Sequence, residues 1–181
     1  MEKRLFLIGY MGAGKTTIGR KLAQDLNLSF IDLDWYIEQR YHKSINELFA
    51  ESGETGFREI EQKIMHEVSD FENVVISTGG GAPCFLDNMQ YMNQKGVTVY
   101  LQLTPLQLFE RLKTGKKNRP LLKDKTDEEL LQFITDMLEK RNPFYQQAQI
   151  IFEHENLNTL KDVKEATNSL IIKIKEGNFM I

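Results

Sequence analysis

The feature that most constrains the fold is a glycine-rich loop, Gly9–Thr16, which follows the apolar stretch Leu5–Ile8 and precedes a helical pattern. Glycines allow successive backbone N–H groups to turn toward an anion, and the N-terminus of the following helix attracts negative charge. A strand, such a loop and a helix in this order predict a phosphate-binding cradle. The alternative is a chance glycine turn between a strand and a helix.

Two side chains at the end of this loop suit a nucleoside triphosphate. Lys15 can reach the β- and γ-phosphates, and the hydroxyl of Thr16 can hold Mg²⁺. The loop therefore predicts what is bound, but it does not predict which reaction follows.

Length and composition exclude several classes of protein. At 181 residues the chain is long enough for about one domain with a hydrophobic core. Its net charge of −3 gives no basic surface for nucleic acid, and no apolar run is long enough to cross a membrane. Cys84 is the only cysteine, so no intrachain disulfide can form. With no signal-peptide pattern at the N-terminus, we expect a soluble cytoplasmic protein.

Strand-like and helix-like segments alternate along the chain, which predicts an α/β fold with a mostly parallel sheet. Signals for helix N-termini occur at Ser44, Thr104 and Thr126, and the last helix is expected at about residues 159–175. The expected strands are Arg4–Ile8, Ser29–Asp32, Asn73–Ser77, Thr98–Leu103 and Gln149–Glu153.

Two aspartates, Asp32 and Asp34, follow the second expected strand. The carboxyl ends of parallel strands form the ligand crevice, and extended alternation would place both carboxylates on one side with Leu33 opposite. One can hold Mg²⁺ through its waters, and the other can orient a hydroxyl and accept its proton. The alternative is that the aspartates cap a helix, a role that suits Asp34 in particular.

Arg58 lies in a helical stretch beside Phe57. A surface ion pair with Glu54 or Glu61, both at helical spacing, is the usual explanation for such an arginine. Arg58 becomes a candidate substrate-binding residue only if other candidate binding residues accompany it.

Three consecutive glycines, Gly79–Gly81, follow the strand that ends at Ser77. They require an unusual backbone conformation or the close approach of a ligand, and their N–H groups could receive an anionic or hydroxylated substrate. Ser77 could hydrogen-bond a water on Mg²⁺. The alternative is a flexible turn, although a turn needs one glycine rather than three.

A basic, glycine-containing loop covers residues 114–120, between two expected helices. Arg119 is placed to close over phosphates, where the transferring group needs a cation. Arg141, at the end of the following helix, could form a carboxylate clamp with Arg58, because guanidinium groups make bidentate contacts. The alternative for the loop is a solvated surface turn.

Taken together, these residues resemble those of the shikimate kinases over nearly the full length of the chain. The glycine-rich loop alone is shared by many nucleotide enzymes, whereas the combination of Asp-x-Asp, Phe-Arg-x-x-Glu and the triple glycine is specific. The matching segments are Gly9–Thr16, Asp32–Asp34, Phe57–Glu61, Ser77–Gly81, Arg119–Leu122 and Arg141–Tyr145.

The resemblance implies a three-layer P-loop kinase fold, a single domain over residues 1–181 with a five-stranded parallel sheet and helices on both faces. It implies a substrate-binding subdomain at about residues 33–61 and a mobile lid at about residues 112–125. The implied reaction transfers the γ-phosphoryl group of ATP to the 3-hydroxyl of shikimate, on the route to chorismate and the aromatic amino acids. The implied state is a monomer that binds neither nucleic acid nor membrane.

The resemblance also implies a role for each matching residue. The implied catalytic residues are Asp34 as the candidate base, Lys15 and Arg119. The implied shikimate contacts are Asp34, Arg58, Gly80, Gly81 and Arg141. The implied ATP contacts are Gly12, Ala13, Gly14, Lys15, Thr16, Thr17 and Arg119, and the implied Mg²⁺ ligands are Thr16 and, through water, Asp32 with Ser77.

One position departs from the family pattern. An arginine that stacks on adenine often precedes the lid in this family, and the nearest equivalent here is Lys113, with Arg111 two residues earlier. Lysine lacks a flat face for stacking, so the adenine end of the site is less well specified than the phosphate end.

Two other hypotheses stand beside this one. Another small-molecule kinase of the same fold, similar to gluconate kinase, would explain the cradle and the lid equally well, but the arginines and glycines less specifically. A nucleotide-binding regulatory module without catalysis is opposed by the joint presence of Lys15, Asp34 and Arg119.

Overall fold

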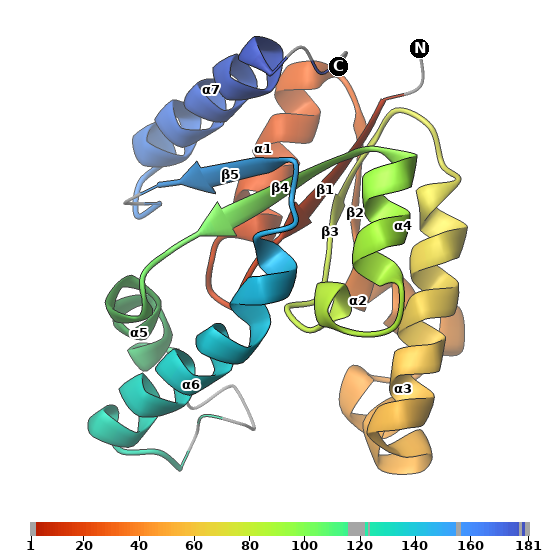
Figure 1. Cartoon of the computed structure of the whole chain (residues 1–181), viewed down its shortest axis with the longest axis vertical. Coiled ribbons are helices and arrows are strands. Elements are labelled where there is room, and N and C mark those ends of the chain that lie inside the picture. Colours follow the sequence, from red (N-terminus) through yellow and green to blue (C-terminus); the bar gives the residue numbers. More distant parts are fainter. Residues whose placement is uncertain (1–2, 116–121, 123, 155–156, 178, 180–181) are drawn as a thin grey trace.

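The computed structural model describes residues 3–115, 122, 124–154, 157–177 and 179, which form a three-layer α/β structure (Figure 1). The strands are β1 (Arg4–Ile8), β2 (Ser29–Asp32), β3 (Val74–Ser77), β4 (Val97–Gln102) and β5 (Ile150–Glu153). The helices are α1 (Lys15–Leu26), α2 (Leu33–Tyr41), α3 (Ile45–Ser69), the short 3-10 helix η1 (Ala82–Cys84), α4 (Asn88–Lys95), α5 (Pro105–Lys113), α6 (Asp127–Tyr145) and α7 (Leu160–Glu176).

The sheet is parallel throughout, with the strand order β2-β3-β1-β4-β5. The central strand β1 pairs with β3 on one side and with β4 on the other, and its residues Leu5–Ile8 are fully buried. Such a continuous apolar run is typical of a strand covered on both faces. The predicted five-stranded parallel sheet of a P-loop kinase is therefore confirmed.

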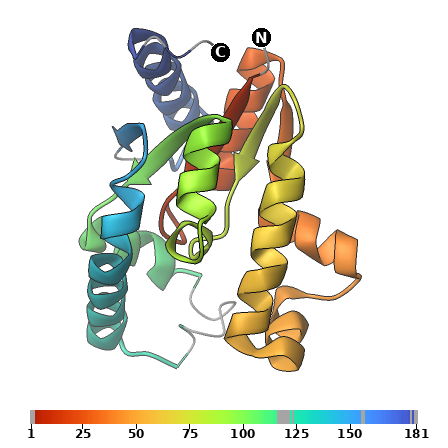
Figure 2. The ribbon, with the colours of Figure 1, turned by 45° about the vertical axis from the view of Figure 1, so that its right-hand side comes forward.

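Helices cover both faces of this sheet. α1 and α7 pack against each other on one face, and α4 lies on the other face beside α3 (Figure 1). In both views, α3 and α6 extend beyond the carboxyl ends of the strands, on opposite sides of that edge (Figure 2). None of the described helices is long and apolar enough to cross a membrane.

The predicted helix starts at Ser44, Thr104 and Thr126 are confirmed. Each of these side chains accepts a hydrogen bond from the backbone three residues on, and the side chain of that residue accepts one from the backbone of the cap. These reciprocal bonds satisfy backbone donors that the first helical turn leaves unpaired, so the chain itself specifies where these helices begin.

The segment after β2 differs from the prediction. The extended alternation expected for Asp32, Leu33 and Asp34 is wrong, because α2 begins directly at Leu33. Asp32 is the N-cap, and its carboxylate accepts a hydrogen bond from the backbone N–H of Trp35 at 3.4 Å. Asp34, which we had considered the better capping candidate, instead lies within the first turn of the helix.

We predict that Leu7→Ala lowers the free energy of unfolding by about 2–5 kcal/mol, because it removes a fully buried side chain from the central strand and leaves a cavity. Leu160→Ala is the matched control, since Leu160 is 91% exposed and should change stability by less than about 0.5 kcal/mol. Urea unfolding of both variants measures the difference. Equal losses would contradict the assignment of β1 to the core.

Candidate active site

The glycine-rich loop joins β1 to α1 at the carboxyl edge of the sheet. Gly9, Gly12 and Gly14 have φ values of 138°, 81° and 93°, in the region that side-chain-bearing residues rarely adopt. The loop closes on itself through a hydrogen bond of 3.1 Å from the N–H of Ala13 to the carbonyl of Tyr10. A loop of this conformation before a helix N-terminus forms a concave site for an anion.

Lys15 is buried and lies across the loop. Its Nζ donates to the carbonyl of Gly9 at 2.8 Å and to the carbonyl of Tyr10 at 3.0 Å. These bonds hold the ammonium group beside the cavity described below, where it can meet phosphate oxygens.

Thr16 and Asp32 lie next to each other although they come from different elements. The Thr16 hydroxyl in α1 donates to the Asp32 carboxylate at 2.8 Å. Asp32 in turn lies opposite Ser77 in the register of β2 and β3. A hydroxyl and a carboxylate at one point are oxygen ligands of the kind that Mg²⁺ prefers.

A cavity of about 370 Å³ opens between the loop and the ends of β2 and β3. It brings together most of the predicted site residues, from the phosphate-binding loop and from the segments that follow β2 and β3. Its lining includes Gly12, Gly14, Lys15, Thr16, Thr17, Asp32, Asp34, Ser77 and Gly80.

Asp34 lines this cavity, and its surroundings change its acidity. Burial, reinforced by the neighbouring Asp32 carboxylate, raises the pKa of Asp34 above its usual value, and Lys15 partly opposes the shift. A carboxylate with a raised pKa is a better proton acceptor at neutral pH than an ordinary aspartate.

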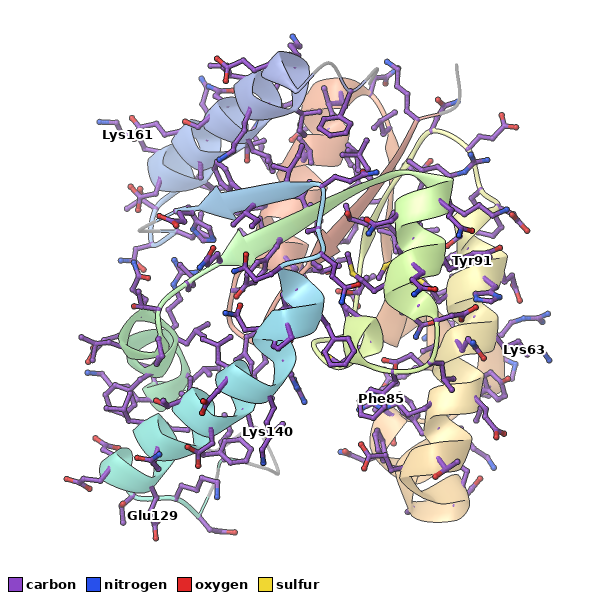
Figure 3. All side chains as sticks on the ribbon, viewed as in Figure 1. Lys63, Phe85, Tyr91, Glu129, Lys140 and Lys161 are labelled. Atoms are coloured by element: carbon purple, nitrogen blue, oxygen red, sulfur yellow. The ribbon has the colours of Figure 1, made fainter. Side chains whose placement is uncertain are left out.

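Arg58 forms both of the ion pairs considered from the sequence, and they differ in environment. Its Nη1 lies 2.6 Å from Glu61, whose side chain is 2% exposed, and its Nη2 lies 3.6 Å from the exposed Glu54. Phe85 lies beside α3 (Figure 3), and the Arg58 guanidinium carbon is 3.9 Å from the centre of its ring. Arg58 is thus anchored within the fold rather than held at the surface.

Glu61, predicted only as a surface partner of Arg58, is instead its buried counter-charge within the site. Burial raises the pKa of Glu61, and the adjacent Arg58 opposes this shift. In the sequence, its role is indicated only by its position three residues after Arg58, and this spacing fits an ion pair on the surface of a helix equally well.

The three glycines permit charged side chains to approach the backbone. A Cβ at Gly79 would lie 2.7 Å from an Asp34 carboxylate oxygen, and one at Gly81 would lie 2.7 Å from Arg58 Nη2. A Cβ at Gly80 would lie 3.4 Å from Arg141 Nη1. None of the three glycines has a positive φ, so the segment does not depend on a left-handed backbone conformation. The close neighbours of these glycines are side chains of the protein, and the predicted close approach of a ligand remains a prediction.

Arg141 reaches the same segment from α6, on the opposite side from α3. Its guanidinium carbon lies 5.5 Å from the centre of the Tyr10 ring, within the range of a cation–π interaction. Tyr145, one turn further along α6, donates its hydroxyl proton to the carbonyl of Gly80. Arg58 and Arg141 therefore converge on adjacent glycines from two different helices.

The other end of the loop borders a second cavity, of about 750 Å³, beside α5 and the segment after β5. Arg111 lines it and donates to the carbonyl of Gly12 at 3.3 Å. Lys113 instead forms an ion pair with Glu110 and lies over the Phe109 ring. Arg119 lies outside the described residues, as does half of the predicted lid.

Fold and site together define a class of protein. A parallel sheet of this strand order, a glycine-rich loop before a helix, and a lysine and a threonine at the helix start are the parts of a P-loop kinase.

The comparisons with known proteins define the family. The shikimate kinase family model matches residues 11–171, and the chain belongs to the shikimate kinase family. The shikimate kinase of Phocaeicola vulgatus is 53% identical over 96% of this chain and 99% of its own length. That of Bacteroides thetaiotaomicron is 57% identical over 92% of this chain and 95% of its own length.

Solved structures agree with this assignment. The crystal structure of the Bacteroides thetaiotaomicron shikimate kinase matches with a TM-score of 0.90 at 52% identity, over 97% of this chain and 99% of that one. The structure of the Acinetobacter baumannii shikimate kinase in complex with shikimate matches with a TM-score of 0.81 at 33% identity, over 97% of this chain and 95% of that one. A gluconokinase from Sinorhizobium meliloti, at 0.60 and 17% identity, shares the fold alone, so the gluconate kinase alternative is not favoured.

We predict that Arg58→Met lowers the free energy of unfolding at about pH 7 by about 3 kcal/mol, because it leaves the buried Glu61 without its counter-charge. A carboxyl whose pKa is raised by burial destabilises the fold once the pH exceeds its usual pKa, so the loss should shrink at acidic pH, as Glu61 takes up a proton.

Glu54→Gln is the matched control, since it removes the exposed partner of the same arginine and should cost less than about 0.5 kcal/mol. Urea unfolding at both pH values measures the two variants. A loss for Arg58→Met that is independent of pH would show that Glu61 does not depend on this pair.

Proposed function

We propose that this chain transfers the γ-phosphoryl group of ATP to the 3-hydroxyl of shikimate, giving shikimate 3-phosphate and ADP. The observation that carries the proposal is the convergence of Arg58, Arg141 and Asp34 on Gly79–Gly81, beside the phosphate-binding loop. Two guanidinium groups suit one carboxylate, and an aspartate suits neighbouring hydroxyls. Shikimate carries both kinds of group.

ATP is proposed to bind along the loop. Backbone N–H groups of the loop and of the first turn of α1 would surround the phosphates, and Lys15 would neutralise the β- and γ-phosphate oxygens. The residues proposed for this role are Gly12, Ala13, Gly14, Lys15, Thr16 and Thr17. The larger cavity beside Arg111 would accept the nucleoside, with Lys113 lying at its margin rather than stacking on adenine.

Thr16 and Asp32 are proposed to hold Mg²⁺, and the oxygen ligands present fit this ion. No group of three or more metal-ligating side chains occurs among the residues that the structure describes, so phosphate and water oxygens would complete its shell. When bound, the ion neutralises charge that develops on the transferring group. Ser77, beside Asp32 in the register, would hydrogen-bond a water of that shell.

Shikimate is proposed to bind between α3 and α6. Arg58 and Arg141 would clamp its carboxylate, while the backbone of Gly80 and Gly81 and the Asp34 carboxylate would contact the ring and its hydroxyls. Asp34 would orient the 3-hydroxyl toward the γ-phosphate and accept its proton as the new P–O bond forms.

The proposal also covers the location, oligomeric state and domain organisation of the protein. The chain would act as a cytoplasmic monomer with one domain over residues 1–181, a substrate-binding subdomain at about residues 33–61 and a lid at about residues 112–125. Arg119 would enter with the lid and stabilise charge on the transferring phosphoryl group. Closure would exclude water and limit the hydrolysis of ATP.

The proposed activity predicts that ATP turnover depends on shikimate. Purified protein with Mg²⁺ and ATP should release ADP in a coupled assay only when shikimate is present, because the acceptor completes the site. Gluconate serves as the control acceptor and should give no turnover. ADP release that is the same with and without shikimate would refute the proposal.

A substitution at Asp34 tests its role in proton transfer. Asp34→Asn should retain ADP binding but lower kcat by about 10²–10⁴-fold, since it removes the proton acceptor without changing the shape of the side chain. Asp25→Asn, at an exposed position near the far end of α1, should leave kcat unchanged. Turnover by Asp34→Asn equal to that of the unmodified protein would remove Asp34 from this role.

The same residue predicts a pH dependence. Asp34 acts only when ionised, and burial raises its pKa, so kcat/KM should fall on the acid side at a higher pH than an ordinary aspartate would give. The pH profile of kcat/KM for shikimate measures this limb. A limb at the ordinary aspartate value would contradict the raised pKa of Asp34.

A further inference from the structure

Two side chains hold the phosphate-binding loop from its outer side. Arg111 Nη1, at the end of α5, lies 3.3 Å from the carbonyl oxygen of Gly12 and 3.4 Å from that of Ala13. His154, directly after β5, places Nε2 2.9 Å from the same Ala13 oxygen. The Ala13 carbonyl is thus bound by two elements that are far from the loop in the sequence.

The contact fixes the proton on the His154 ring. A carbonyl oxygen only accepts, so Nε2 carries the proton and donates it to Ala13. Burial and the nearby Arg111 lower the pKa of His154 to about 4, which keeps the ring neutral at neutral pH.

The other ring nitrogen, Nδ1, is buried without a hydrogen-bond partner among the described residues. An unpaired buried polar atom is costly, and an apolar side chain of similar size would avoid that cost. The histidine therefore carries a penalty at this position that the bond to Ala13 must offset. His154 itself is only 8% exposed.

The bond to Ala13 determines which way the next N–H points. Within a planar trans peptide, the carbonyl of Ala13 and the N–H of Gly14 point in opposite directions. Because the carbonyl is held by His154, the Gly14 N–H is directed away from that side chain, and Gly14 lines both the 370 Å³ and the 750 Å³ cavities, where phosphates are proposed to lie.

Glycine at position 14 does not by itself select this orientation. A glycine accepts positive and negative φ almost equally, so the Ala13–Gly14 peptide could rotate without a steric penalty from a side chain. Gly14 has a φ of 93° here. An external bond to the Ala13 oxygen is what distinguishes the two orientations.

We propose that His154 is a positioning residue that locks the Ala13–Gly14 peptide so that the Gly14 N–H faces the phosphates of the nucleotide. This rests on the proposed function only in that the loop binds a nucleotide. The shorter bond, from His154, provides the main restraint, and the two longer contacts of Arg111 support it. A loop held in its binding conformation loses less freedom when the ligand arrives.

The test compares His154→Phe, which keeps a ring but removes the donor, with His154→Gln, whose amide N–H can restore it. Calorimetric titration with ADP should show about threefold to tenfold weaker binding for His154→Phe, the effect of one hydrogen bond. Titration with adenosine, which has no phosphate, should be unchanged. His154→Gln should recover ADP binding to within about threefold of the unmodified protein.

Glu153→Gln is the matched control, since Glu153 is the exposed neighbour on β5 and should leave ADP affinity unchanged. His154→Leu is measured in parallel, and thermal unfolding identifies which variants retain the fold. ADP affinity for the donor-lacking variants equal to that of the unmodified protein would overturn the proposal. So would an equal loss of ADP and adenosine binding, or a failure of His154→Gln to recover.

The titrations also separate this inference from the proposed function. A protein that binds ADP but phosphorylates no shikimate would refute the proposed acceptor, while the variants would still decide the role of His154.

Discussion

The register of the parallel sheet determines where the polar groups of the site lie. Leu7 of β1 lies opposite Ser77 of β3, and Ser77 lies opposite Asp32 of β2. All three strands therefore end at one level, and the phosphate-binding loop, the aspartate pair and the triple glycine leave the sheet side by side. Close packing on both faces of the buried strands holds this level fixed, because a shift of one residue would misplace every side chain against the helices.

Charge balance governs the part of the site that lies beyond this edge. Asp34 and Glu61 both face Gly79, and Arg58 and Arg141 meet the two glycines that follow. Each of the two carboxylates has a raised pKa, and a nearby cation opposes the shift. The four groups form one network, in which the loss of a single charge changes the protonation of its neighbours.

The sequence predicted the sheet, the helix caps and the phosphate-binding loop because each depends on residues close together in the chain. The proximity of Asp32 and Asp34 to the loop was predicted correctly from strand ends, but through an extended conformation that the start of α2 rules out. Individual hydrogen bonds between distant segments could not be predicted. Arg111 bonds to Gly12, 99 positions away, and no local pattern indicates that distance or direction. The roles assigned to Arg119 remain predictions.

The central position of β1 has a consequence for how the chain emerges during synthesis. Phe6 pairs with Ile76 on one side and with Thr98 on the other, so the first strand to be made obtains its neighbours only after much of the chain has followed. Until then, its apolar residues and both rows of its backbone hydrogen-bonding groups have no sheet partners. Such delayed, non-local pairing slows folding and exposes the nascent chain to aggregation, so this protein is most vulnerable before its fourth strand is complete.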